Sequence, residues 1–137
     1  MWLLFFTWPP GFTAGSLNFI VMEKYLLLVR EDLKRISMET DEERLKAIQE
    51  MTRWTESLAE SCNYLGGEPL LATGRCVSKD QVISDGPFIE AKEGISGYIA
   101  ILAENLNQAV SIAQSCPRVM RNEMTIEVRP VLVLNQT

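Results

Sequence analysis

The stretch MEKYLLLVRED, residues 22–32, contains a continuous apolar run from Tyr25 to Val29. A run of this length without polar alternation is typical of a strand that is covered on both faces. Residues 95–102, ISGYIAIL, have the same character apart from one serine and one glycine. We therefore expect the chain to build its sheet around these two strands.

Two helices are expected between the strands. The sequence TDEE at residues 40–43 is a Thr-x-x-Glu capping box, which indicates a helix start. Apolar residues follow at spacings of three and four over residues 47–62, and Gly66-Gly67 is expected to end this helix. Asn105 is the expected N-cap of a second helix, which Pro117 ends.

Three further strands are expected, at residues 69–77, 82–83 and 124–134. The resulting order β-α-β-β-α-β, with an inserted hairpin, predicts an α+β fold: a ferredoxin-like sandwich in which two helices cover one face of an antiparallel sheet. The strands at 25–29 and 95–102 are apolar on both faces. We therefore expect a second copy of the chain to cover the other face, with a lined cavity between the facing sheets.

Composition limits the chemistry. The 137 residues fit one domain, and 13 basic against 18 acidic residues give a net charge of −5, which argues against direct nucleic-acid binding. The chain contains no histidine, so Ser-His-Asp and Cys-His catalysis are excluded and zinc loses its commonest nitrogen ligand. Acid–base chemistry must use carboxylates, lysine, tyrosine or a thiol, and we expect neither a metal nor a cofactor.

The cysteines indicate a compartment. The chain has three cysteines, an odd number, and they lie far apart in the sequence: Cys62, Cys76 and Cys116. We expect them to be small buried side chains of a protein in the reducing cytoplasm, rather than parts of a disulfide or metal site.

Residues 1–21 differ from the rest, because every charged residue of the chain lies from Glu23 onward. The apolar run at 1–8 is too short to span a bilayer, and it lacks the basic start of a secretory signal. We expect the domain to occupy residues 22–137, with Met22 as a natural start. A weak membrane-associating or signal-like role for residues 1–21 stays open as the alternative.

The last strand carries a charged pair. If Ile126 and Val128 face the core, then Glu127 and Arg129 lie on the open face of the sheet. Such a pair is either a solvated pair on the strand or the polar end of a pocket.

The stretch ISDGPFIEAKEGISGYIAI, residues 83–101, contains a second group of charges. Asp85-Gly86-Pro87-Phe88 has the composition of a structural loop. The same loop presents Asp85, Glu90 and Lys92 just before Tyr98, so it is also a candidate edge of a site.

These residues resemble the signature of the YCII-related family, in its DGPF-domain branch. The motif at 85–88, the later Gly97-Tyr98, the start at 22–29 and Glu127-Val128-Arg129-Pro130 agree in order. The resemblance implies a dimeric α+β barrel built from ferredoxin-like halves. It also implies one of two roles. Some relatives are enzymes that act on ring lactones, and others occur beside sigma-factor domains, which suggests a regulatory role. The family's proposed catalytic His–Asp pair cannot be transferred, because this chain has no histidine.

Two functions follow as hypotheses, and a third possibility is a stable dimer without a pocket function, whose loop matters only for folding. The first is a small-molecule enzyme of isomerase or lyase type, with a pocket between the sheets of a homodimer. The second is a non-catalytic module that binds a ligand or a regulatory protein such as a sigma factor. In the first, the general base is Asp85 or Glu127, and Arg129 or Lys92 holds an anionic substrate. Tyr98 is the candidate proton donor, and Glu90 is a further substrate-binding candidate.

Overall fold

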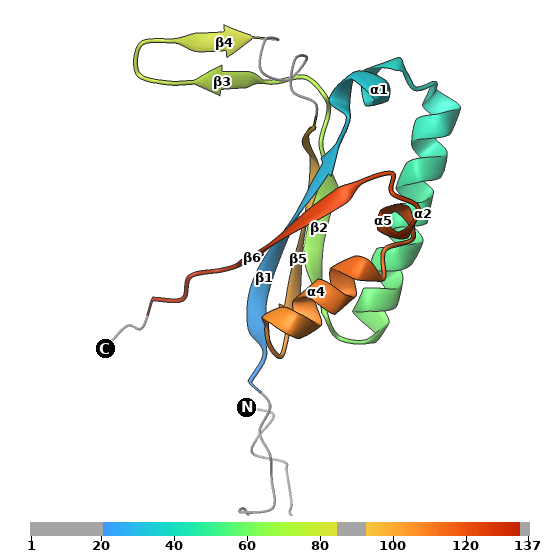
Figure 1. The fold of residues 1–137 in the computed structure, drawn as a ribbon, viewed down its shortest axis with the longest axis vertical. Coiled ribbons are helices and arrows are strands. Elements are labelled where there is room, and N and C mark those ends of the chain that lie inside the picture. The colour runs from blue at the N-terminus through green and yellow to red at the C-terminus, as the bar shows by residue number, and fades with distance from the viewer. Residues whose placement is uncertain (1–20, 85–92, 135–137) are drawn as a thin grey trace, which may run out of the picture.

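The computed structural model describes residues 21–84 and 93–134 (Figure 1). Residues 1–20 of the predicted extension at 1–21 lie outside these ranges, as do Asp85, Glu90 and Lys92. The elements in chain order are β1 (Glu23–Glu31), α1 (Leu33–Met38), α2 (Asp41–Glu60), β2 (Tyr64–Pro69), β3 (Arg75–Val77), β4 (Val82–Ser84), β5 (Gly94–Ala103), α4 (Leu106–Gln114), α5 (Pro117–Met120) and β6 (Thr125–Pro130).

The main sheet has four strands in the order β2-β5-β1-β6, and each neighbouring pair is antiparallel. The short β3 and β4 form a separate two-stranded sheet. Figure 1 shows α2 and α4 on the same side of the main sheet. The prediction of a mixed α+β fold with an antiparallel sheet is therefore confirmed. Within the described residues the sheet is open and does not close into a barrel.

The core lies between the sheet and the helices, and strand alternation selects its residues. Tyr25, Leu27 and Val29 of β1 point to the helices and are buried, as are Ile99 and Ile101 of β5. Trp54 and Leu58 of α2 and Ala109 and Ala113 of α4 pack against them. The predicted inward direction of Ile126 and Val128 is confirmed, since both pack on this core.

The predicted helix starts are confirmed by their hydrogen bonds. The backbone N–H of Glu43 donates to Thr40 Oγ1 at 3.1 Å, and the Thr40 N–H donates to Glu43 Oε2 at 3.1 Å. Asn105 Oδ1 accepts from the N–H of Gln108 at 2.8 Å. Pro117 lies at the first position of α5 rather than simply ending a helix, because proline has no N–H to lose there.

The end of α2 was predicted too late. The helix ends at Glu60, with Cys62 in a left-handed conformation (φ 62°), so no glycine is needed to end it. Gly66 and Gly67 belong to β2 instead, where the register against β5 shifts between Tyr64 and Gly66. A Cβ on Gly67 would lie 2.5 Å from the carbonyl oxygen of Tyr98. Gly67 therefore permits a close approach of two strands.

The face of the sheet away from the helices carries a band of half-buried apolar side chains. Leu26 and Leu28 of β1 lie beside Ala100 and Leu102 of β5 on this open face.

Only one of the three cysteines fits the prediction of buried thiols, because Cys116 is buried while Cys62 and Cys76 are exposed. Cys62 lies just after the end of α2, and Cys76 lies in β3 of the separate two-stranded sheet.

Candidate functional site

A cavity of about 210 Å³ lies between α2 and the main sheet. Much of its lining is apolar and comes from Val29, Ala47, Ile48, Met51, Tyr64 and Ile99. Four charged residues also line the cavity: Glu31, Arg44, Glu68 and Arg118. Hydroxyl-bearing residues of the lining include Thr52, Thr55, Ser96 and Tyr98. A concave, mostly apolar space with a few polar groups is the usual form of a small-molecule site.

One stripe of α2 forms a wall of the cavity. Its members are Arg44, Ala47, Ile48, Met51 and Thr55. Their spacings of three, one, three and four residues place them on one side of the helix. The sequence predicted an apolar stripe of this helix over residues 47–62 that packs into the core. In the structure Trp54 and Leu58 are buried in the core, and the half-buried Met51 packs against it. Ala47 and Ile48 are half-buried and, like Met51, border the cavity.

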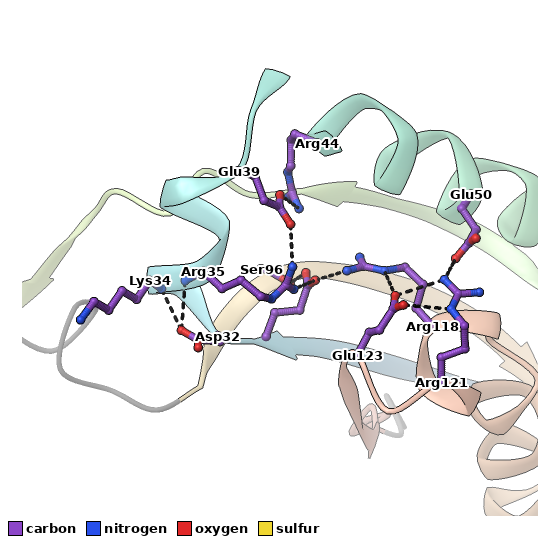
Figure 2. A network of polar contacts seen from close by, with 11 residues as sticks. Asp32, Lys34, Arg35, Glu39, Arg44, Glu50, Ser96, Arg118, Arg121 and Glu123 are labelled. Atoms are coloured by element: carbon purple, nitrogen blue, oxygen red, sulfur yellow. Dashed lines mark hydrogen bonds and ion pairs between the residues drawn. The ribbon is translucent and has the colours of Figure 1, made fainter. Parts of the chain in front are cut away.

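The polar centre of the cavity is Glu31, which the alternation of β1 directs to the buried face after Tyr25, Leu27 and Val29. Its Oε1 accepts from Arg118 Nη2 at 2.7 Å. Its Oε2 accepts a short hydrogen bond from the hydroxyl of Ser96. Figure 2 shows the side chains of Ser96 and Arg118 approaching each other from separate parts of the chain.

An outer layer of charges surrounds this centre (Figure 2). Arg35 of α1 lies between two acids, with Nη2 3.3 Å from Glu31 Oε1 and Nη1 2.7 Å from Glu39 Oε1. On the other side, Arg118 Nε donates to Glu123 Oε2 at 3.2 Å. Arg121 then joins Glu123 to Glu50 of α2, at 2.9 Å and 2.5 Å.

The electrostatics of the centre depend on close pairing. The side chains of Arg118 and Glu31 are 5% and 2% exposed. Burial lowers the pKa of Arg118, but the charges and hydrogen bonds of Glu31 and Glu123 outweigh it, so the pKa lies above its usual value. A protein in which two well-packed apolar side chains replace a buried ion pair is often equally stable. Stability alone therefore gives only a weak reason for the Glu31–Arg118 pair. Buried charges beside a cavity are therefore candidates for a functional site.

The open face holds three of the residues that the sequence singled out. Tyr98 and Glu127 lie on either side of Leu28, and Arg129 lies opposite Leu26. Glu127 forms long ion pairs with Arg30 at 3.6 Å and with Arg129 at 3.9 Å.

The Tyr98 hydroxyl donates to Glu68 at 3.1 Å, and this hydrogen bond raises the pKa of Tyr98. Ionisation of this hydroxyl is therefore harder than that of a free tyrosine. Whether Tyr98, Glu127 and Arg129 bind a substrate stays a prediction. The same holds for Asp85, Glu90 and Lys92, which lie outside the described residues.

Sequence reasoning missed the Glu31–Ser96–Arg118 cluster. Glu31 had a usable signal, because a carboxylate at the fourth position of an alternating buried set interrupts an otherwise apolar face. Arg118 had none, since it follows Pro117 in a short helix whose packing depends on the whole fold. Ser96 was noted only as a polar exception within an apolar strand.

Residues 21–84 and 93–134 contain neither a metal-binding cluster of side chains nor a helix that could span a membrane. Histidine, cysteine and acidic side chains do not gather there in groups of three that could hold a metal ion. None of the helices in these ranges combines the length and the hydropathy that a membrane span requires.

Comparison with known proteins identifies the family of the chain. No curated protein matches it. A family model described as the YCII-related domain matches residues 24–135, which include all the helices and strands described above except Glu23, the first residue of β1. The match covers far more than half of the 137 residues. The chain therefore belongs to the YCII-related family.

Proposed function

We propose that the protein binds a small molecule in the cavity between α2 and the sheet. The observation that carries this proposal is the Glu31–Arg118 pair, which is almost fully buried and lines an apolar cavity of about 210 Å³. An engineered apolar cavity of about 150 Å³ binds benzene. The space here therefore suits a compact ligand with an apolar body.

The same groups support chemistry of isomerase or lyase type. Both reactions require a group that removes or supplies a proton at the bound molecule. The carboxylate of Glu31 lies on the cavity wall, and the hydroxyl of Ser96 donates a hydrogen bond to it. Glu31 is therefore the acid–base candidate of the cavity, with Ser96 and Arg118 as the groups that orient it.

We further propose that the active form is a homodimer whose open faces meet, so that two ferredoxin-like halves form a dimeric α+β barrel. The strand order and the half-buried Leu26, Leu28 and Leu102 support this arrangement. A second cavity between the facing sheets would then be bordered by Glu127 and Arg129, the residues predicted from the sequence for that place.

Native mass spectrometry of the untagged full chain, purified gently from its own source, tests the ligand proposal. The informative variant is Ala47→Phe, which fills the cavity from α2. Its matched control is Ala59→Phe, at an exposed position of the same helix. We expect a reproducible extra mass on the wild type and on Ala59→Phe, and its loss from Ala47→Phe.

Two outcomes would contradict the proposal. A mass retained by Ala47→Phe would place the ligand elsewhere. Protein without any bound molecule, in all three forms, would favour the alternative of a module that binds a regulatory protein such as a sigma factor.

A further inference from the structure

Arg44 is a cavity residue without a close partner among the described residues. Its Nη1 lies 3.9 Å from Glu39 Oε2, which is too far for a hydrogen bond. Arg35 occupies the other oxygen of Glu39 at 2.7 Å. Glu39 Oε2 itself is buried and has no hydrogen-bond partner among the described residues. The Arg44–Glu39 contact is therefore loose, in contrast to the 2.7 Å pair of Arg118 and Glu31.

The charges that face the cavity are unequal. Its charged lining residues are Glu31, Arg44, Glu68 and Arg118. Glu68 lies opposite Tyr98 in the β2–β5 register, and the Glu68 carboxylate accepts a hydrogen bond from the Tyr98 hydroxyl. The Glu68 carboxylate is therefore engaged on the open face of the sheet. Two guanidinium groups and one carboxylate then remain on the helix side, which is a surplus of one positive charge.

We infer that the ligand of this cavity is an organic carboxylate whose acid group binds Arg44. This inference rests on the proposed ligand-binding function and adds the chemical class to it. A carboxylate matches the planar guanidinium fork and can accept two charge-assisted hydrogen bonds from it. Arg44 is 23% exposed at its side chain, so a ligand group can reach it.

The α2 stripe fixes the direction of the bound molecule. Arg44 begins the stripe, and Ala47, Ile48 and Met51 continue it along the helix. A carboxylate on Arg44 therefore places the apolar body over these three side chains. Ser96 of β5 and Arg118 of α5 also line the cavity and can form hydrogen bonds with a second polar group of the ligand.

Hexanoate and hexanamide are suitable probes, because they share one shape and differ in charge. In proportion to the ~150 Å³ cavity that holds benzene, this cavity holds roughly eight non-hydrogen atoms, which is their size. The experiment is a titration of the isotope-labelled full chain with each probe at neutral pH, followed by NMR. We expect both probes to shift the amide signals of α2. Hexanoate should bind at least about tenfold more tightly than hexanamide, because one charge-assisted pair contributes about this factor in affinity.

Variants assign the preference to Arg44. Arg44→Gln should weaken hexanoate about tenfold and leave hexanamide unchanged. Arg53→Gln, at an exposed position of the same helix, should bind both probes as the wild type does. If Arg44→Gln proves unstable, the comparison of the two probes on the wild type still decides the chemical class.

The outcomes separate the two proposals. Equal binding of hexanoate and hexanamide in the cavity would overturn the carboxylate class and leave the ligand-binding function standing. A preference for hexanoate that survives in Arg44→Gln would overturn the role of Arg44. Absence of binding by either probe would count against the cavity as a ligand site.

Discussion

Glu31 and Arg118 are 87 positions apart in the chain, yet Arg118 Nη2 lies 2.7 Å from Glu31 Oε1. Glu31 comes from the end of the first strand and Arg118 from the last short helix. The pair therefore joins the beginning of the domain to its end, inside the wall of the cavity. Its energetics can be separated from its role in binding by substitution.

Removing one partner of this pair should be costly. Arg118→Met leaves the Glu31 carboxylate buried without its closest cation, and we expect a loss of about 3–5 kcal/mol in the free energy of unfolding. The double variant Glu31→Leu/Arg118→Met buries no uncompensated charge and should lose clearly less. Urea denaturation of the wild type, of Glu31→Leu and Arg118→Met as single variants, and of the double variant measures this. A double variant as unstable as the sum of the single ones would show that the pair is not coupled.

Glu123 gives a pH-dependent prediction. The hydrogen bond from Arg121 lowers the pKa of Glu123 in the folded state. Its contribution to stability is therefore present above the unfolded pKa, and it is lost as the pH falls through the lower folded value. Because Glu123 is 41% exposed, we expect Glu123→Gln to cost at most about 1 kcal/mol at neutral pH.

The measurement for Glu123 is urea denaturation of wild type and Glu123→Gln from neutral to acid pH. The difference between the two should shrink toward zero below the pKa of Glu123. A difference that stays constant over this range would mean that charge is not the cause.

The close approach of β2 and β5 predicts different costs for two glycines. A Cβ on Gly67 would lie 2.5 Å from backbone, whereas one on Gly97 would lie 3.1 Å from it. Gly67→Ala should therefore destabilise the fold by about 1–3 kcal/mol, as overpacking does, and Gly97→Ala should cost less. Thermal unfolding of both variants checks the order, and the reverse order would contradict the strand spacing described here.

The proposed dimer can be tested at Leu28, which faces Glu127 on the open side of the sheet. Leu28→Glu places a second negative charge beside Glu127 in the proposed interface. We expect a folded monomer by light scattering and circular dichroism. Leu71→Glu, at an exposed position outside the main sheet, is the control and should remain dimeric. A Leu28→Glu protein that is still a dimer would exclude this face as the interface.

Much of the fold follows from local patterns. The apolar runs around Tyr25–Val29 and 95–102 predict the central strands, and the capping box at Thr40 and the N-cap Asn105 predict two helix starts. The end of α2 does not follow, because a left-handed Cys62 takes the place that the glycine rule assigns to Gly66. A residue that leaves a helix without glycine gives no signal in the sequence.

The site divides in the same way. The sequence by itself determined the strands, the helix starts, the absence of histidine chemistry and the open-face position of Glu127 and Arg129, because each depends on neighbours within a few residues. Only the tertiary structure decided that Glu31 meets Ser96 and Arg118, and that Arg44 borders the same cavity. These contacts join segments that the sheet order and the packing of α2 and α5 bring together, and no local pattern encodes such distances.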